Sequence, residues 1–324
     1  MLTHRALAVL LTLLAALPWA APCAAQSYPQ RPVRIILPFP PGSSGDLMMR
    51  LLSQRMSEDF RQPIIIDNRS GGAGIAAAEI VAKGLPDGYT LFFTGINHVT
   101  NVGLYQNLPF DVARDFVAIS LVGSVPGVLV AHPGTGFKTV KDLVDAAKAK
   151  PRGLNFGSAG NGTGGHLSME MFMRANGIAL THVPYKGATF ALTDTVAGQV
   201  QVLFTGLPPT ISLIRDGRLN ALVVSGVKRQ PTLPNTPSMG DIGLSKSDVQ
   251  IWFGLVTRAG TPKAVLDQIS SLVVRLVREP EVIEKMAAQG IDPAGSTPAE
   301  FEQTIQRDLE RLPKLIRESG IKAQ

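Results

Sequence analysis

The sequence predicts an α/β fold of two lobes, each a central, mostly parallel sheet flanked by helices. Short apolar runs alternate with amphipathic segments of helix length along most of the chain, which is the pattern of parallel sheets covered by helices. The 324 residues, 45% of them hydrophobic and 17% charged, can bury the cores of two such lobes. Two loops rich in glycine and serine each follow a strand and precede a helix. Because ligands gather where parallel strands end, we expect these loops to face one cleft.

The first lobe is expected to use residues 26–124. Its strands are short runs rich in apolar, β-branched and aromatic residues, at 33–38, 64–67, 90–94 and 117–122. Helices are expected from Leu47, at 73–83 and in the segment that ends at Tyr105. The chain then crosses to the second lobe within residues 122–130.

The second lobe is expected to span residues 125–225. Its strands are predicted at 128–131, 154–157, 180–184, 200–205 and 221–225, and its helices at 140–150, 167–176 and 188–197. A proline-rich stretch without hydrophobic periodicity follows, so residues 226–250 are predicted to form an extended connector. Residues 251–324 then return to the first lobe, with a strand at 251–256 and helices at 262–278, 281–289 and 298–316.

The N-terminus resembles a secretory signal peptide. A short positive segment with His4 and Arg5 precedes an apolar run and a tail of small residues. The run is shorter than the ~20 residues of a membrane span. We expect an exported protein, with the leader 1–25 cleaved after Ala25 and Cys23, the only cysteine of the chain, removed with it. A mature chain without cysteine has no disulfide, no thiolate metal site and no cysteine nucleophile.

Charge and composition exclude several functions. The net charge of +6 falls to +5 without the leader, and no cluster of lysine or arginine is interleaved with aromatic residues, so no nucleic-acid partner is expected. The five histidines show no His-x-His or His-x-x-x-His spacing, and no Gly-x-Ser-x-Gly elbow occurs. We therefore expect no metal, no cofactor and no catalytic residue. A modest positive charge suits a small anionic ligand.

The first loop rich in glycine and serine lies between a predicted strand and a predicted helix. Its sequence is Phe39, Pro40, Pro41, Gly42, Ser43, Ser44, Gly45 and Asp46. Such a loop brings free backbone N–H groups and the positive end of a helix dipole to one point, where a carboxylate or phosphate binds. We expect the N–H groups and Ser43 or Ser44 to contact the anion. Because Asp46 would repel an anion, we expect it to order the loop instead.

The second loop, at 156–165, has the same design. It formally matches the Gly-x-Gly-x-x-Gly pattern of dinucleotide sites. Such a site would also need an acidic residue about 20 positions onward, but residues 182–186 contain none. A nucleotide-dependent enzyme is therefore the weaker interpretation. Two anion-binding loops in one chain predict a clamp around a small acid.

A series of motifs gives the chain a resemblance to a known family. They include Phe39-Pro40-Pro41-Gly42, Asp67-Asn68-Arg69, Pro86-Asp87-Gly88-Tyr89, Asn155-Phe156-Gly157-Ser158, Gly160-Asn161-Gly162-Thr163, His182-Val183-Pro184-Tyr185-Lys186-Gly187 and Trp252-Phe253-Gly254-Leu255. With these motifs in this order, the chain resembles the Bug (TctC-like) family, the periplasmic solute-binding proteins of tripartite tricarboxylate transporters. The resemblance implies a two-lobed periplasmic binding protein fold of type II. It also implies a non-enzymatic protein that binds a small carboxylate and delivers it to a membrane permease. We expect a monomer.

The candidate ligand-binding residues come from both loops and from the ends of other strands. The first lobe supplies Phe39, Pro40, Gly42, Ser43, Ser44, Asp46, Thr94, Asn97 and His98, and the second supplies Ser158, Ala159, Gly160, Asn161, Gly162, Thr163, His166, Tyr185, Lys186 and Thr205. His98 is the histidine expected to face the cleft, whereas packing or capping is favoured for His166. Many relatives have an aspartate where this chain has Thr205, whose hydroxyl is neutral. An amino-acid ligand is therefore less favoured.

Two other functions stay open at this point. A binding protein whose closed form signals to a sensor would need the same clamp, so the sequence does not separate it from a transport protein. An α/β enzyme that holds a nucleotide in the second loop would need a nucleophile or an acid–base pair in the cleft, and none has a recognisable spacing. Lys186 has two interpretations, a partner for a distal carboxylate or a solvated lysine.

Overall fold

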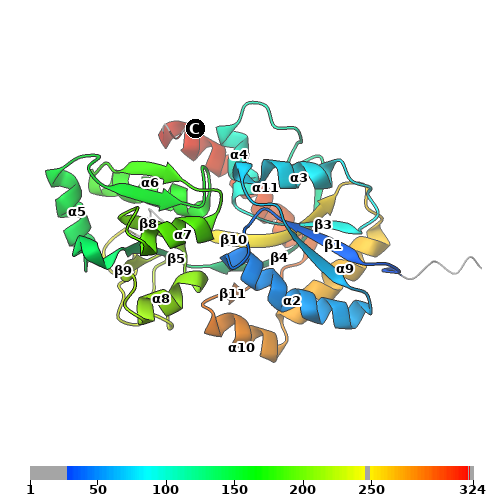
Figure 1. The fold of residues 1–324 in the computed structure, drawn as a ribbon. Coiled ribbons are helices and arrows are strands. Elements are labelled where there is room, and N and C mark those ends of the chain that lie inside the picture. The colour runs from blue at the N-terminus through cyan, green and yellow to red at the C-terminus, as the bar shows by residue number, and fades with distance from the viewer. Residues whose placement is uncertain (1–27, 245–248, 320, 322–324) are drawn as a thin grey trace, which may run out of the picture.

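The structure of the protein is a computed structural model that describes residues 28–244, 249–319 and 321. The predicted leader, its cleavage after Ala25 and Cys23 lie outside the described residues. Within them, the strands form two sheets with helices packed on their faces (Figure 1). No helix of the described ranges is both long and apolar enough to cross a membrane.

The first sheet has, among the described residues, six strands in the order β11-β4-β10-β3-β1-β2. These strands are β1 (Val33–Leu37), β2 (Ile64–Asn68), β3 (Thr90–Gly95), β4 (Phe116–Val125), β10 (Ile251–Arg258) and β11 (Asp292–Pro293). Strand β1 is parallel to β2 and β3. Strand β10 is antiparallel to β3 and β4, and β11 is antiparallel to β4.

The second sheet has five described strands in the order β7-β6-β8-β5-β9. They are β5 (Gly127–Ala131), β6 (Asn155–Ser158), β7 (Thr181–Pro184), β8 (Val202–Gly206) and β9 (Asn220–Val224). Strand β6 is parallel to β7 and β8, whereas β5 is antiparallel to β8 and β9. We call the elements around the first and second sheets the first and second lobes.

The α/β fold class with two lobes is confirmed, but the sheets are mixed rather than mostly parallel. Strand β4 carries the chain out of the first sheet and β10 brings it back, so these two neighbours run in opposite directions. Strands β5 and β9 enter and leave the second sheet in the same way. In Figure 1, β4 and β10 lie in the middle of the molecule, between the helices of the two lobes. The antiparallel pairs therefore belong to the segments that connect the lobes.

Helices cover both sheets. The first lobe has α2 (Ser44–Phe60), α3 (Ile75–Ala82), α4 (Asn97–Leu104), α9 (Lys263–Val277), α10 (Pro280–Ala288) and α11 (Pro298–Ser319), and the second has α5 (Val140–Ala149), α6 (Gly164–Asn176), α7 (Ala188–Val196) and α8 (Ile211–Arg215). Helices α2 and α6 begin earlier than predicted, because Ser43 and Thr163 have the extended backbone of an N-cap. The last glycines of both predicted loops therefore lie in first turns of helices. Helix α8 and strand β11 were not predicted.

The core of the first lobe lies on both faces of its sheet. Along β1, Ile35 and Leu37 pack in one cluster with side chains of α2 and α9, whereas Ile36 belongs to the opposite cluster with α3 and α11. This alternation follows from the two-residue period of a strand. All three side chains have no exposed surface. The continuous apolar run of β1 thus reflects burial on both faces.

The connector is only partly as predicted. Residues 226–244 form turns instead of an extended segment. Leu233 and Met239 are buried in the two hydrophobic clusters of the second lobe, and Ser238 makes a parallel bridge with Val224 at the end of β9. The extended prediction is wrong for this part because these apolar side chains find a surface on the second sheet.

Candidate functional site

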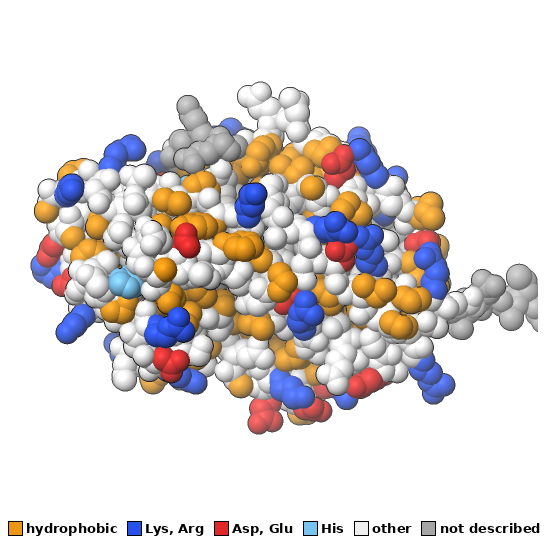
Figure 2. Space-filling view, in the orientation of Figure 1, with side chains coloured by type: hydrophobic (Ala, Val, Ile, Leu, Met, Phe, Trp, Pro, Cys, Tyr) orange, Lys and Arg blue, Asp and Glu red, His pale blue; other side chains and the backbone are white. Residues whose placement is uncertain are grey.

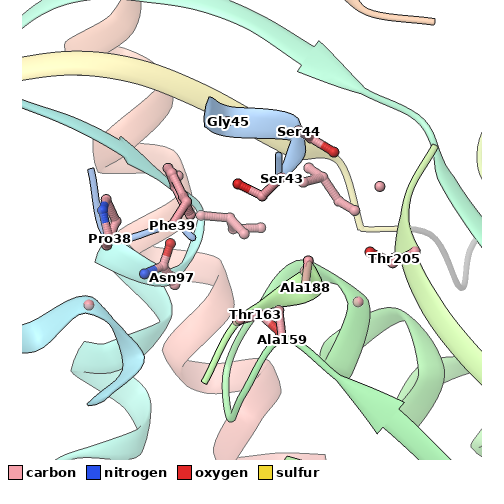
Figure 3. A pocket seen from close by; sticks show the side chains of 18 of the residues that line it. Pro38, Phe39, Ser43, Ser44, Gly45, Asn97, Ala159, Thr163, Ala188 and Thr205 are labelled. Atoms are coloured by element: carbon pink, nitrogen blue, oxygen red, sulfur yellow. The ribbon is translucent and has the colours of Figure 1, made fainter. Parts of the chain in front are cut away.

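A pocket of about 100 Å³ lies between the two lobes. The first lobe contributes Pro38, Phe39, Pro40, Ser43, Ser44, Gly45, Gly71, Gly72, Ala73, Gly74, Gly95, Ile96, Asn97, Ile251, Trp252 and Phe253; the second contributes Ala159, Thr163, Gly164, Gly165, Tyr185, Lys186, Gly187, Ala188, Phe204, Thr205 and Gly206. Most of these residues stand at or just after the carboxyl ends of β1, β3, β6, β7 and β8, where open α/β sheets bind ligands. Figure 3 shows Ser43 and Ser44 facing Ala159, Thr163 and Ala188 across the cavity. The volume suits one small organic molecule or several waters.

Asp46 holds the first loop together from behind the pocket. Its side chain is 1% exposed and accepts a hydrogen bond from the backbone N–H of Gly42 at 2.9 Å. It also accepts from Nε of Arg50 at 2.8 Å and from Nδ2 of Asn68 at 2.9 Å. Burial raises the pKa of Asp46, but the hydrogen bonds from Arg50, Gly42 and Asn68 outweigh it, so the pKa lies below its usual value. The prediction that Asp46 orders the loop is confirmed.

The start of α2 presents donors to the pocket. The N–H groups of Ser44 and Gly45 lie in the first helical turn and have no acceptor among the described residues. The hydroxyl of Ser43 accepts from the N–H of Asp46 at 3.4 Å and so keeps its own proton to donate. A Cβ on Gly45 would lie 2.6 Å from the Phe39 ring. Glycine at 45 therefore lets the helix start close to the wall.

Some N–H groups of the second loop donate to other groups of the protein, and others belong to residues of the pocket wall and have no acceptor among the described residues. The N–H of Gly160 donates to Oγ of Ser158 at 3.1 Å, and that of Gly162 donates to Nδ1 of His166 at 3.1 Å. The N–H groups of Ala159, Gly164 and Gly165 have no acceptor among the described residues. These three residues line the pocket.

Several predicted contacts in the second loop therefore need correction. Ser158, Gly160, Asn161 and Gly162 lie outside the pocket wall. The hydroxyl of Ser158 and the N–H groups of Gly160 and Gly162 bind within the second lobe. Instead, Gly164 and Gly165 at the start of α6 face the cavity. A Cβ on Gly165 would overlap the carbonyl oxygen of Phe204, so α6 begins in direct contact with β8.

Four predicted first-lobe residues lie outside the pocket wall. Gly42 and Asp46 bond to each other within the loop, and the predictions for His98 and Thr94 are wrong. His98 does not face the cleft: it is 2% exposed and packs against Phe92, Phe110 and Phe116, with its ring centroid 4.6 Å from that of Phe116. Burial lowers the pKa of His98 to about 3. Thr94 is fully buried inside β3 and is not part of the wall.

The helix and strand periods explain both errors. Asn97 lines the pocket, and the next residue on α4, about 100° around the helix, points into the core. Nδ2 of Asn97 donates to the carbonyl of Ala73 at 3.0 Å, and Nδ2 of Asn101, one turn later, donates to the same carbonyl at 3.0 Å. Along β3 the alternation of faces brings Gly95 rather than Thr94 to the cavity.

His166 and His182 form a stack behind the second loop. Their rings lie 4.0 Å apart and 9° from parallel, and His182 stacks on Phe156 at 4.6 Å. Nε2 of His182 lies 2.7 Å from Oγ of Ser158. Burial and the neighbouring His166 lower the pKa of His182 to about 3. His166 lies outside the wall, as its packing role predicts.

Lys186 is the only charged residue of the pocket wall, and no carboxylate of the described residues lines it. Its ammonium has no hydrogen bond or ion pair to a described residue. The adjacent ring of Tyr185 forms part of the wall, but its hydroxyl donates to Asp194 at 2.8 Å. Burial and Asp194 raise the pKa of this tyrosine to about 12. Outside the pocket, the face drawn in Figure 2 mixes acidic and basic side chains around hydrophobic patches.

Part of the wall was not predicted from the sequence. Its unpredicted members include Pro38, Gly71, Gly72, Ala73, Gly74, Ile96, Gly187, Ala188, Phe204, Gly206, Ile251, Trp252 and Phe253. Most of them lie inside a predicted strand or within three residues of its end, and the rule that ligands bind at the carboxyl ends of strands would have found Pro38, Ile96, Phe204 and Gly206. Ile251, Trp252 and Phe253 stand at the start of β10, where the chain returns to the first lobe. Only the antiparallel pairing of β10 with β3 brings them to the cavity.

The whole chain is similar to a family of transport receptors. The family model TctC, described as the tripartite tricarboxylate transporter family receptor, matches residues 48–321. Protein BugT of Bordetella pertussis is 32% identical over 320 residues, 98% of each chain.

Solved structures share the fold over nearly all of their length. The R. palustris protein Rpa4515 with adipate is 31% identical with a TM-score of 0.89, and the match covers 92% of this chain and 100% of that one. The periplasmic binding protein BugD is 28% identical with a TM-score of 0.87 over the same shares. MatC from Rhodopseudomonas palustris with bound malate is 27% identical with a TM-score of 0.84, covering 89% of this chain and 100% of that one. The chain therefore belongs to the tripartite tricarboxylate transporter receptor family, TctC, alongside the Bug periplasmic binding proteins.

Proposed function

We propose that this protein is a periplasmic solute-binding protein that captures a small carboxylate between its lobes and delivers it to a tripartite tricarboxylate-type permease. One observation carries the proposal. Ser44 and Gly45 on one lobe, and Gly164 and Gly165 on the other, have free N–H groups and line one cavity, whose wall has a single cation and no carboxylate among the described residues. Each helix N-terminus also contributes about half a positive charge. One carboxylate that accepts from both helices would hold the lobes together.

The rest of the wall indicates what the ligand carries besides its carboxylate. Phe39, Trp252 and Phe253 give one side of the cavity an apolar and aromatic surface, which suits an aliphatic or aromatic body. An ammonium group has no anionic partner there, and Thr205 is neutral. An isolated charge without a partner is costly to desolvate. The ligand is therefore a carboxylic acid without an amine.

Lys186 favours acids with a second negative group. It is the only cation that the described residues contribute to the wall, and its Cβ and Cγ lie about 4 Å from where a Cβ of Gly71 on the opposite lobe would stand. A second carboxylate would find this ammonium as its partner. The relatives solved with adipate and malate carry dicarboxylates, which supports the same ligand class for this chain.

A thermal-shift screen with matched acids tests the proposal. Succinate is compared with aspartate, and adipate with 2-aminoadipate, because each pair differs only in the amine. Butyrate and benzoate test whether one carboxylate suffices. An acid at 100 times its Kd raises the free energy of unfolding by about 2.7 kcal/mol, and we expect this for a dicarboxylate and not for its amino analogue. If protein freed of copurified ligand responds to no carboxylate, the proposal is wrong.

Delivery and cellular location belong to the same proposal. Export to the periplasm follows from the predicted leader, and a monomer with no metal or cofactor suffices for capture and release. A sensing role with the same clamp is the alternative, and a nucleotide-dependent enzyme is the weaker one. Deleting the gene should abolish uptake of the radiolabelled acid if the protein serves transport. Unchanged uptake with lost induction of target genes would favour sensing.

A further inference from the structure

Gly162 lies where the lobes meet, and side chains from both lobes hold its backbone. Its carbonyl accepts a hydrogen bond from Oγ1 of Thr100 on α4 of the first lobe, at 2.7 Å. Its N–H donates to Nδ1 of His166 on α6 of the second lobe, at 3.1 Å. Thr100 has no exposed surface, and His166 is 3% exposed. Gly162 thus connects a hydroxyl of one lobe to an imidazole of the other.

Of the hydrogen bonds that join the two lobes within the described residues, the one from Thr100 to Gly162 is buried. A second hydrogen bond between the lobes, from Nη2 of Arg174 to the carbonyl of Glu318 at 3.2 Å, is exposed. Elsewhere the lobes meet mainly by packing, as where Gly206 lies against Ser44. A buried hydrogen bond is strengthened by its low-dielectric surroundings, and a buried group left without a partner is costly.

The imidazole of His166 is held in place from three sides. One face stacks on His182 at 4.0 Å, and Nε2 lies 3.6 Å from Oε1 of Glu170 one turn along α6. Because Nδ1 accepts from the N–H of Gly162, the ring proton of the neutral form belongs on Nε2, toward Glu170. The ring therefore presents a lone pair to the N–H of Gly162, and this hydrogen bond limits the movement of the residue whose carbonyl meets Thr100.

We propose that Thr100, Gly162 and His166 form a closure latch that sets how far the lobes close and how long a bound acid is retained. None of the three lines the pocket, so Thr100 and His166 act as positioning residues. The hydrogen bond between Thr100 and Gly162 forms only when the lobes meet, so it stabilises the closed state relative to the open one. The retention of an acid rests on the proposed function, but the closure of the lobes does not.

Thr100→Val tests the latch, because valine keeps the shape of threonine and cannot donate a hydrogen bond. In the ligand-free protein we expect a larger radius of gyration by small-angle scattering. The fluorescence of Trp252, which lines the pocket, follows dissociation of adipate and of malate, and we expect about tenfold faster release. Thr100→Ser keeps the hydroxyl and should restore the wild-type values.

His166 variants test the second half of the latch. His166→Phe keeps an aromatic ring on His182 but removes the acceptor, and we expect release to accelerate as in Thr100→Val. His166→Asn places an oxygen near the position of Nδ1 and should recover most of the loss. Because Thr100 bonds the carbonyl and His166 the N–H of the same residue, Gly162, the Thr100→Val/His166→Phe double variant should release the acid little faster than either single variant.

The outcomes separate the latch from the ligand class. If adipate and malate bind, and Thr100→Val and His166→Phe match wild type in radius and release rate, the latch is overturned. If both variants act alike on melting temperature but not on radius or release, the residues are merely structural and the latch is again overturned. If no acid binds while Thr100→Val opens the ligand-free protein, the proposed ligand class fails and the latch is supported.

Discussion

The two loops that face the pocket have the same design but are ordered by different chemistry. The first is held by a buried carboxylate, since Asp46 accepts hydrogen bonds from Gly42 and from side chains of Arg50 and Asn68. The second is held by neutral groups, the stacked imidazoles of His166 and His182 with the hydroxyl of Ser158. The proposed anion site can therefore have a carboxylate beside it, provided that this carboxylate faces away from the pocket. The difference also predicts that the two loops lose their structure under different conditions.

Removing the carboxylate of the first loop should have the largest effect. Asp46→Ala deletes three accepted hydrogen bonds at a buried position and leaves the N–H of Gly42 without its acceptor. We expect a loss of about 3 kcal/mol in the free energy of unfolding, with part of the Arg50 attraction discounted because that guanidinium is half exposed. The melting temperature by circular dichroism measures it.

Asp59→Ala is the matched control on the same helix. Asp59 pairs with Arg275 at 3.0 Å at the surface, so its loss should change stability by less than about 1 kcal/mol. Equal effects of the two substitutions would show that Asp46 does not order the loop. Asp46→Asn should fall between them, because it keeps only one of the two acceptor oxygens.

Gly165→Ala should displace the second loop without changing its histidines. The added Cβ would overlap the carbonyl oxygen of Phe204, so the start of α6 must move away from β8 and take its free N–H groups with it. We expect acid binding to weaken about 10- to 100-fold, the equivalent of 1–3 kcal/mol of overpacking. Titration calorimetry with the acid found in the screen measures it.

Gly157→Ala, in β6 of the same lobe, is the control. A Cβ there meets its nearest neighbour, Val200, at an ordinary 3.4 Å, so binding should stay close to wild type. Wild-type affinity in Gly165→Ala would contradict the assignment of the α6 N-terminus to the ligand.

Low pH should destabilise the second loop before the first, and this is the smallest of the expected effects. The pKa of His182 is lowered to about 3 in the folded protein, so between pH 6.5 and 3 the unfolded chain binds more protons. Stability therefore falls as pH falls through this window, by at most about 1.4 kcal/mol per pH unit for one group. The pKa of Asp46 is also lowered, so its contribution is complete above about pH 4 and is lost only below it.

Melting temperatures of wild type and of His182→Phe between pH 7 and 4 measure this difference. We expect the variant to lose part of the acid sensitivity. His98, whose pKa burial also lowers to about 3, adds a similar slope in the first lobe, and His98→Phe should remove it separately. If both variants keep the full slope of wild type, these histidines are not the groups that titrate.

The local parts of the fold and of the site could be predicted from the sequence. Every described strand except β11, both loops and the role of Asp46 follow from residues close together in the chain. The partners of these residues do not. Asn68, which donates to Asp46, lies at the end of β2, and only the pairing of β1 with β2 brings it near. His98 was misplaced because no local pattern tells which side of a short buried helix meets the core.

The second loop shows the same limit. Its glycines predicted free N–H groups, but two of them are taken by Ser158 and His166, since a hydrogen-bond acceptor happens to stand within reach of each. The part of the wall at 251–253 was predicted as a strand but not as part of the site, because it comes from a segment far along the chain. Long-range pairing, not local propensity, decides which residues meet the ligand.

The central position of β10 also constrains how the protein folds. The second sheet is completed by one continuous stretch of chain, from β5 to β9, so it can form early. The first sheet stays divided, with β2, β1 and β3 on one side and β4 on the other, until β10 inserts between β3 and β4. Such non-local pairing is slow and leaves unpaired strand edges exposed in the meantime. When the chain is synthesised from its N-terminus, the sheet of the first lobe, which forms one side of the pocket, can therefore be completed only after β10 has emerged.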